Sequence, residues 1–460
     1  MYKKLLLLSR HSLIKGSAIV FGGTAIINGL NYVFHLITGR MLGPDQYSIL
    51  AALISLSYVI GFPATLINTL ITQKIAAYAA LRDNRGMKTF LFSMTRHVAL
   101  LAVLIVMAFV VLQSAIASFL HIEQKVLVLL LGLEFAFSLL IIIPLATLQG
   151  LLRFISFSAL SILSAFLRVV FSYGAILLGL GVLGVLYGMF GSILVTGIVA
   201  LFMLPTIFSL SKKGKSPAVS AVKPYWLYAF QSTLVVMSSI NYLRIQSHFL
   251  KRFTLKRYFT QKWIAVALLG KGLLINVDVL LVKHFFESYD AGLYAAMATM
   301  GKIVLFFASS LSIVLLPIAT QKHAKGKSAV KELLLAQAGI IVLSSVILLA
   351  YRVMPELVIS LLYGREYFAI APYLWLFGIY FLLYNMSYTF VNYFISGKHT
   401  LILTMPLVIS VVQIGGIILF HRSFYDVLSV MIGSASLLIL VFMVYFYRYA
   451  RQQRRIEFNH

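Results

Sequence analysis

The sequence predicts an all-α polytopic membrane protein with about 12 transmembrane helices, in two pseudo-symmetric six-helix lobes around a central cavity. Of its 460 residues, 61% are hydrophobic and only 11% are charged, and the mean hydropathy is +0.98. Soluble domains are about 45–50% apolar and about 25% charged. The apolar runs reach about 20 residues, the length of a membrane-crossing helix, rather than about 10 alternating residues as in a barrel strand. A helical hairpin also occurs twice, which predicts the two lobes.

Each apolar run of sufficient length predicts one span. The predicted spans are residues 16–38, 48–71, 98–119, 126–148, 155–179, 183–208, 261–283, 291–317, 332–351, 371–394, 401–420 and 424–447.

The spans divide into an N-terminal lobe, residues 1–208, and a C-terminal lobe, residues 261–460, which ends in a basic tail. Residues 209–260 form a basic cytoplasmic or interfacial connection. Within it, Tyr225–Tyr242 is moderately apolar, and we interpret it as an interfacial helix. The alternative is a thirteenth span, which would place the following basic run outside the cell or break the parity of the topology.

The loop charges predict the orientation in the membrane. About 29 of the Lys and Arg side chains fall on one side of the predicted topology and about six on the other, so the positive-inside rule places the first set in the cytoplasm. Both termini are then cytoplasmic, in a multi-pass protein of the cytoplasmic membrane. The outer side holds Arg40, Lys125, Lys283, Arg352, Arg365 and Arg422.

The same distribution explains the net charge of +26 without nucleic acid. A basic excess in cytoplasmic loops attracts anionic lipids, so we expect membrane lipids and no nucleic acid as partners. The sequence contains no Cys, no nucleotide-binding glycine loop and no His cluster with metal-ligand spacing. We therefore expect no cofactor, no metal and no enzymatic activity.

The repeated hairpin supports two related lobes. In each copy a polar turn is followed by a tyrosine, Tyr47 in the first and Tyr294 in the second. The second helices then end on similar residues, Thr-Gln-Lys-Ile-Ala at 72–76 and Thr-Gln-Lys-His-Ala at 320–324. Six spans per lobe give both lobes the same sense across the bilayer, as in parallel-repeat transporters, with the substrate path between them.

Five ionisable residues lie deep inside four of the predicted spans, where charge is costly and usually functional. They are Glu134, Arg168, Lys271, Asp278 and Lys302. Structural explanations remain open for each. Glu134 and Arg168 could pair as an ion bridge, Lys271 could extend to the interface, Lys302 could have an unseen partner, and Asp278 could be a hydrogen-bonded structural carboxylate.

The functional interpretation follows from the excess of cations. An interior with Lys271, Lys302 and Arg168 attracts an anion, and phosphate oxygens suit ammonium and guanidinium groups. A lipid diphosphate headgroup is the anion we expect, with Asp278 or Glu134 as candidates for coupling an ion or proton. Further polar groups are candidates for sugar or cavity contacts, although such residues more often join helices. These are Asn28, Asn31, His35, Arg40 and Asn68.

Several short motifs resemble the polysaccharide (O-antigen-type) flippase family of the multidrug/oligosaccharidyl-lipid/polysaccharide exporter superfamily. The turn Gly39-Arg40-Met-Leu-Gly-Pro-Asp-Gln-Tyr47 is similar to that family's R-x-LGP-x-x-Y turn. The stretches Leu148-Gln-Gly150, Asn276-Val-Asp278, Ala291-Gly-Leu-Tyr294 and Leu361-Leu-Tyr-Gly364 carry further similarity. A departure is Ser48, where many members have Gly.

The resemblance implies alternating-access translocation of a polyprenyl-diphosphate-linked oligosaccharide for surface polysaccharide assembly. The expected partners are the lipid-linked oligosaccharide, with a glycan polymerase and a ligase. Two alternatives stay open. One is a multidrug or cation antiporter of the same superfamily, for which an acidic interior is expected. The other is a non-transport membrane component of glycan assembly.

Overall fold

The computed structural model describes residues 2–81, 83–209, 254–324, 328–397, 399 and 401–458, and every regular element in these ranges is a helix. Ten of the described helices are long and apolar enough to cross a membrane, and α1 with α2 forms a further bent pair. The predicted all-α polytopic membrane fold is therefore confirmed, and each predicted span overlaps a helix. Residues 225–242, the interfacial segment or thirteenth span, lie outside the described residues.

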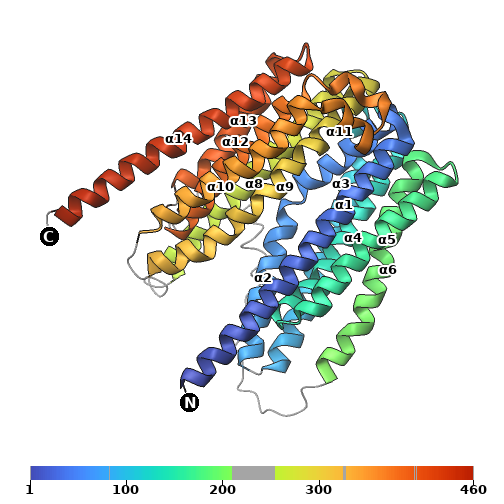
Figure 1. Cartoon of the computed structure of the whole chain (residues 1–460). Helices are drawn as coiled ribbons and strands as arrows, with labels where there is room; N and C mark the ends of the chain where they lie inside the picture. Colours follow the sequence, from blue (N-terminus) through green and yellow to red (C-terminus); the bar gives the residue numbers. More distant parts are fainter. Residues whose placement is uncertain are drawn as a thin grey trace, which may run out of the picture. The chain divides into compact units, whose positions relative to one another are not determined.

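The elements follow one another along the chain as labelled in Figure 1. They are α1 (Tyr2–Ile60), α2 (Phe62–Ala80), α3 (Asn84–Phe119), α4 (Lys125–Gly150), α5 (Phe154–Leu177), α6 (Gly181–Ser209), α8 (Thr254–Phe285), α9 (Ser288–Ala324), α10 (Val330–Val353), α11 (Pro355–Leu362), η1 (Arg365–Ile370), α12 (Leu374–Ser396), η2 (Leu401–Thr404), α13 (Met405–Leu419) and α14 (Phe424–Phe458).

The described chain divides into two compact units. Unit 1 contains α1 up to Leu42 and the chain from Ile60 to the end of α6; unit 2 contains Gly43–Val59 and everything from α8 onward. The sequence analysis assigned residues 1–208 to one lobe, whereas the structure groups the last part of α1 with the C-terminal helices. The lobes 1–208 and 261–460 thus stay a prediction.

Unit 1 is held by an apolar core shared among α2, α3 and α4. Ile71, Phe90 and Leu139 belong to this core and are buried. In α5 and α6, a side chain at Gly188 would collide with the backbone of Ser172, so the two helices approach closely there. Close approach at small residues is the usual way in which membrane helices associate, because lipid provides no hydrophobic drive between them.

In unit 2, α12 packs against α9 and α10, and α13 packs against α8 (Figure 1). The face of α12 that meets its neighbours carries a column of aromatic rings, in which Phe377 stacks on Phe381 and contacts Tyr380 edge-on. Gly301 on α9 makes room for these rings, since a side chain there would collide with Phe377. The aromatic column therefore fixes α9 against α12.

The last part of α1 is embedded in unit 2. Its Tyr47 is fully buried, and the hydroxyl is hydrogen-bonded to the hydroxyls of Thr299 on α9 and Tyr363, each at 3.1 Å. Next to it, Gly292 lies so close to the carbonyl group of Pro44 that no side chain fits. Gly43 has φ of 71° and ψ of 172°, which is not a helical conformation, so it separates two helical segments of α1 at a kink. Only glycine adopts this conformation readily.

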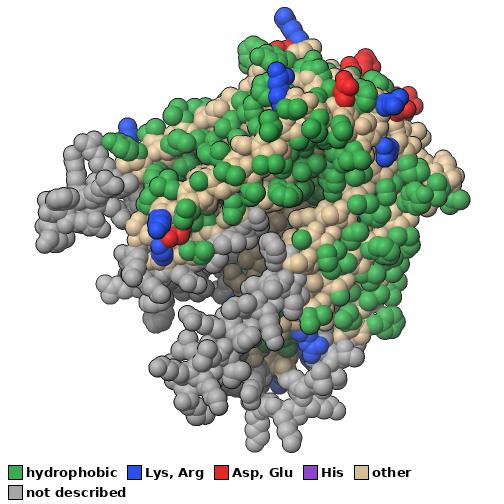
Figure 2. Space-filling view, in the orientation of Figure 1, with side chains coloured by type: hydrophobic (Ala, Val, Ile, Leu, Met, Phe, Trp, Pro, Cys, Tyr) green, Lys and Arg blue, Asp and Glu red, His purple; other side chains and the backbone are tan. Residues whose placement is uncertain are grey.

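Side chains that face outward from the helices are apolar. On the face shown in Figure 2, hydrophobic groups cover the sides of the described helices, and charged groups lie near helix ends. On α3, Phe92, Val103 and Val111 are 79%, 59% and 74% exposed. A helix this apolar and this exposed is suited to lipid, so α3 is a lipid-facing span of unit 1.

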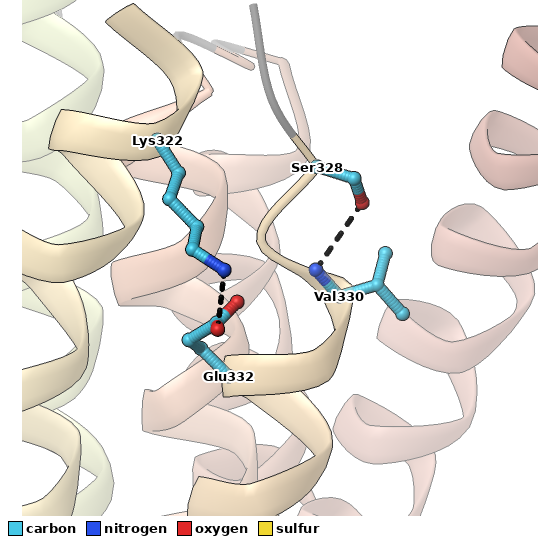
Figure 3. Close-up of polar contacts among 4 residues, drawn as sticks. All are labelled: Lys322, Ser328, Val330 and Glu332. Atoms are coloured by element: carbon cyan, nitrogen blue, oxygen red, sulfur yellow. Dashed lines mark hydrogen bonds and ion pairs between the residues drawn. The ribbon is translucent and has the colours of Figure 1, made fainter. Parts of the chain in front are cut away.

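Polar contacts tie the ends of consecutive helices in unit 2. At one end, Lys322 of α9 forms an ion pair with Glu332 in the first turn of α10, and the backbone N–H of Val330 donates to Ser328 (Figure 3). At the other, the ammonium of Lys283 donates to the Ser288 hydroxyl at 2.7 Å across the tight turn between α8 and α9. The predicted short turn at this place is confirmed.

The main differences from the predicted helices have local causes. The expected turn between the first two spans is present but shorter than predicted, because only Gly43 is non-helical there. Pro44 then lies in the first turn of the next helical segment, a position that tolerates proline. The predicted span 48–71 breaks at Gly61, which is followed by Pro63 in the first turn of α2. The short elements α11 and η1 were not predicted, because they are too short to cross a membrane.

Candidate functional site

A polar network lies among the apolar helices of unit 2. The ammonium of Lys302 on α9 donates to Oδ1 of Asn276 on α8 at 3.1 Å. About two turns earlier on α9, the hydroxyl of Tyr294 donates to Oδ2 of Asp278 at 3.0 Å. Asn276, Asp278 and Tyr294 are buried and Lys302 is half-buried. Lys302 and Asp278 therefore belong to two neighbouring hydrogen-bonded pairs and attract each other electrostatically.

A second set of hydrogen bonds joins α8 to α12 and α13 through a backbone carbonyl. The carbonyl oxygen of Leu274 on α8 accepts hydrogen bonds from the Tyr380 hydroxyl at 2.5 Å and from Nε2 of Gln413 at 3.2 Å. Both side chains are fully buried. Buried polar groups of this kind are costly unless paired, so the four helices are fixed in register around residues 274–278.

Lys271 occupies a separate place on α8, about two helical turns before Asp278. Its ammonium lies 3.7 Å from the centre of the Tyr388 ring on α12. This is a cation–π contact, in which the negative face of the ring attracts the charge. Lys271 and Tyr388 also line a narrow cleft between α8, α12, α13 and α14, together with the buried Tyr384.

In unit 1, Arg168 on α5 lies with its guanidinium 5.7 Å from the centre of the Phe34 ring on α1. Glu134 on α4 experiences the charge of Arg168. Their charged atoms do not approach within the 4.0 Å of an ion pair. Glu134 and Arg168 therefore attract each other electrostatically but do not form the ion bridge of the structural explanation. The structure places Lys271 and Lys302 in unit 2 and Arg168 in unit 1.

The interior cations share one property. Among the described residues, neither Lys271, Lys302 nor Arg168 forms an ion pair with a carboxylate; their nearest partners are Tyr388, Asn276 and Phe34. In a low-dielectric interior a charge without a close counter-ion is costly. Asp278 and Glu134 act on Lys302 and Arg168 from beyond ion-pair distance.

The candidate sugar contacts in unit 1 fall into two groups. Asn68 on α2 accepts a hydrogen bond from Thr72 one turn later on the same helix, and it is Thr72 that also contacts Gln149 on α4. The others lie along α1: Asn28, Asn31 and His35 are half-buried and Arg40 is exposed. Oδ1 of Asn31 is buried and has no hydrogen-bond partner among the described residues.

The aromatic residues of the site were missed by the sequence analysis. Tyr380, Tyr384 and Tyr388 recur at every fourth residue of α12, which places them on one face of the helix. This spacing was visible in the sequence, but tyrosines in an apolar span are usually packing residues. Within the described ranges, no group of three or more His, Cys, Asp or Glu side chains is arranged to hold a metal ion.

Comparisons with known proteins give a likeness in structure only. No family model and no curated protein matches the sequence. Among solved structures, the lipid II flippase MurJ in an inward closed conformation matches with a TM-score of 0.62 and 13% identity, over 94% of this chain and 87% of that chain. An inward-facing multidrug resistance transporter of the MATE family matches with a TM-score of 0.60 and 14% identity, over 92% and 93%.

A third match is a transporter of the MOP superfamily from Pyrococcus furiosus, described as having a binding pocket of reverse polarity. Its TM-score is 0.52 and its identity is 14%, over 96% of this chain and 95% of that chain. At these identities the matches establish the fold and not the substrate. The chain therefore has the fold of the MOP superfamily transporters.

Proposed function

We propose that this protein is a flippase of the cytoplasmic membrane that translocates a polyprenyl-diphosphate-linked oligosaccharide by alternating access, for surface polysaccharide assembly. Both termini are then cytoplasmic, as the loop charges indicate. The shared fold supports a transporter, since a lipid flippase and multidrug transporters are among the matches. The choice of an anionic lipid rests on the site.

One observation carries the proposal. Three cationic side chains lie within membrane-spanning helices, and none of them forms an ion pair with a carboxylate among the described residues. Lys271 and Lys302 are proposed to bind the diphosphate within unit 2, and Arg168 is proposed as a cationic contact for an anionic headgroup within unit 1. A diphosphate supplies the negative charge that these groups lack, and charge-assisted hydrogen bonds to phosphate are among the stronger ones.

The acidic residues have different proposed roles. Asp278 is held by Tyr294 beside Lys302, and Glu134 lies in the field of Arg168. Each is placed to respond when the neighbouring cation takes up phosphate. We propose these two carboxyl groups as the sites that couple an ion or proton to transport. A glycan polymerase and a ligase are the proposed partners that use the translocated product.

The cation antiporter is the second candidate. The buried carboxylate of Asp278 favours it, because a carboxylate can bind a cationic drug or a proton. Against it, Asp278 already has a hydroxyl donor and a neighbouring ammonium. If the protein is a drug antiporter, the Asp278→Asn variant should lose drug export. If it is the proposed flippase, the same variant should leave drug susceptibility unchanged.

The test uses proteoliposomes that contain a fluorescent polyprenyl-diphosphate-linked oligosaccharide, with translocation read from loss of protection against a membrane-impermeant quencher. Lys271→Gln combined with Lys302→Gln should reduce translocation at least tenfold, because the interior loses both ammoniums of unit 2. Lys271→Arg should keep part of the activity, because a guanidinium also binds phosphate.

The matched control is Lys125→Gln, which removes an exposed lysine at the start of α4. It should translocate as the unchanged protein does, provided that all variants insert equally. Normal translocation by the Lys271, Lys302 double variant would overturn the proposed binding role. Absence of translocation in the unchanged protein would overturn the proposed substrate.

A further inference from the structure

The end of α10 that the loop charges assign to the cytoplasm has an open groove that takes no part in the proposed transport. The groove has a volume of about 540 Å³ and is lined by Ser328, Val330, Lys331, Leu334 and Leu335. All five residues belong to unit 2. A water molecule in the liquid occupies about 30 Å³, so this groove has room for a group of many atoms.

The charge at the groove is carried by Lys331. Its side chain is exposed, and it forms no ion pair with any residue that the structure describes. The next residue, Glu332, attracts Lys331 electrostatically, but the Glu332 carboxylate is already paired with Lys322 of α9 (Figure 3). These three side chains together carry one net positive charge at the start of α10, so the groove attracts an anion.

Ser328 adds a hydrogen-bond donor to the same groove. Its Oγ accepts the backbone N–H of Val330 at 3.3 Å, which leaves the hydroxyl hydrogen of Ser328 able to donate (Figure 3). The side chain is exposed, so a ligand can reach it. An ammonium and a hydroxyl that both donate suit the oxygens of a phosphate group.

Beyond the groove, α10 has a continuous apolar side. Leu335, Val342, Val346 and Leu349 follow one another at spacings of seven, four and three residues, so they lie on one side of the helix. They are between 61% and 66% exposed. Lys331 lies four residues before Leu335 and thus on the same side. The rise from Lys331 to Val342 is about 16 Å, or about half the thickness of the hydrocarbon core, so an acyl chain of one leaflet can lie along it.

We propose that this groove binds an anionic phospholipid from the leaflet on the predicted cytoplasmic side. The Lys331 ammonium and the Ser328 hydroxyl donate to its phosphate, and one acyl chain lies along Leu335 and Val342. A lipid fits better than an acidic protein, because Leu335 belongs both to the groove and to the side of α10 that faces lipid. The site is independent of the proposed transport substrate.

The sequence contains no Cys, so a single fluorescent reporter can be attached at a chosen position. Val342→Cys, labelled with bimane, places the reporter where the acyl chain is proposed to lie. The labelled full chain is reconstituted in vesicles of phosphatidylcholine and phosphatidylglycerol, of which one or the other is brominated in its acyl chains. Bromine quenches the fluorophore on contact, so exchanging the brominated component gives the relative affinity of the two lipids at this position.

Phosphatidylglycerol should be preferred about fivefold, the scale expected for one lysine near an anionic membrane surface. Lys331→Gln should bring the ratio of affinities close to one, because the net charge of the groove is lost. Lys331→Arg should keep the preference, because a guanidinium also binds phosphate. Equal affinity for the two lipids in the labelled protein, or a preference that survives Lys331→Gln, would overturn the inference.

Two controls separate a site from general attraction to the membrane. Lys125→Gln removes one exposed lysine at the start of α4 and changes the net charge equally, so it should keep the fivefold preference. A reporter at Val111→Cys, on the lipid-facing side of α3, should detect the two lipids about equally. Soluble glycerol phosphate should leave the ratio at Val342→Cys unchanged. Displacement of phosphatidylglycerol by glycerol phosphate would mean that the groove binds a free phosphate compound, and the lipid would be the wrong occupant.

Discussion

The Tyr294 hydroxyl on α9 donates a 3.0 Å hydrogen bond to Oδ2 of Asp278 on α8, and both side chains are buried. Replacing Tyr294 with Phe removes that donor and leaves a buried carboxylate less well satisfied. We expect a loss of about 1–3 kcal/mol in the free energy of unfolding. Asp278→Asn and the double variant complete a thermodynamic cycle, measured by thermal unfolding in detergent. Strictly additive effects would contradict direct coupling between the two side chains.

Gly292 tests the close approach of α9 to the last part of α1. A methyl group at this position would overlap the carbonyl group of Pro44, which is backbone and cannot move aside as a side chain does. Gly292→Ala should therefore destabilise unit 2 and reduce the yield of monodisperse protein. Gly433→Ala in α14 is the matched control, since nothing lies within 4 Å of its added methyl group. A normal size-exclusion profile for Gly292→Ala would contradict the predicted collision.

Gly43 tests backbone conformation rather than space. Its φ is 71° and its ψ is 172°, a region that other residues rarely adopt, yet the nearest atom to an added methyl group is 3.9 Å away. Gly43→Ala should cost about 1–3 kcal/mol through strain alone. The check is the thermal unfolding midpoint. If Gly43→Ala unfolds at the same temperature as the unchanged protein, the kink does not require glycine.

His399 should make the stability of unit 2 depend on pH. It lies between α12 and η2, with Nδ1 3.1 Å from the Tyr445 hydroxyl. Burial lowers the pKa of His399, and the nearby His323 lowers it further. In acid the unfolded chain, with a pKa near 6.5, binds a proton before the folded chain does. Stability should thus be fully present above about pH 6.5 and decrease as pH falls toward the lower folded pKa.

The measurement is the unfolding midpoint between pH 5 and pH 8. His399→Gln cannot take up the proton and should show a smaller decrease in acid. The charged and titratable groups near this end of α9, α12 and α14 are His323, Tyr393, Tyr445 and Lys322 with its partner Glu332. A pH profile for His399→Gln that matches the unchanged protein would assign the dependence to those groups instead.

Much of the fold follows from patterns that a bilayer imposes. Apolar runs of spanning length predicted where the helices lie, because lipid leaves each backbone group to be paired within its own helix. The break at Gly61 was also visible, since Gly and Pro occur together there. The membership of Gly43–Val59 in unit 2 was not predictable in this way, because both sides of Gly43 are equally apolar and only long-range contacts separate them.

The sequence showed which residues of the site are charged, but not which side chains those residues contact. Lys271, Asp278 and Lys302 could be selected from the sequence because placing a charged side chain inside a membrane span costs free energy, and such residues are usually functional. Sequence spacing did not show that Lys302 bonds Asn276 rather than a carboxylate, or that Lys271 lies on Tyr388. Those contacts depend on how α8, α9 and α12 rotate against one another. Hydropathy carries little information about that rotation when every face of a helix is apolar.

The burial of Tyr47 has a consequence for biogenesis. Its partners Thr299 and Tyr363 come 252 and 316 residues later in the chain, so the segment around Tyr47 leaves the ribosome long before they exist. The segment must therefore wait in the bilayer, unassembled, until the C-terminal half has been inserted. A gene divided between α6 and α8 would yield a C-terminal fragment that lacks part of its own interior, and only co-expression of both fragments would supply it.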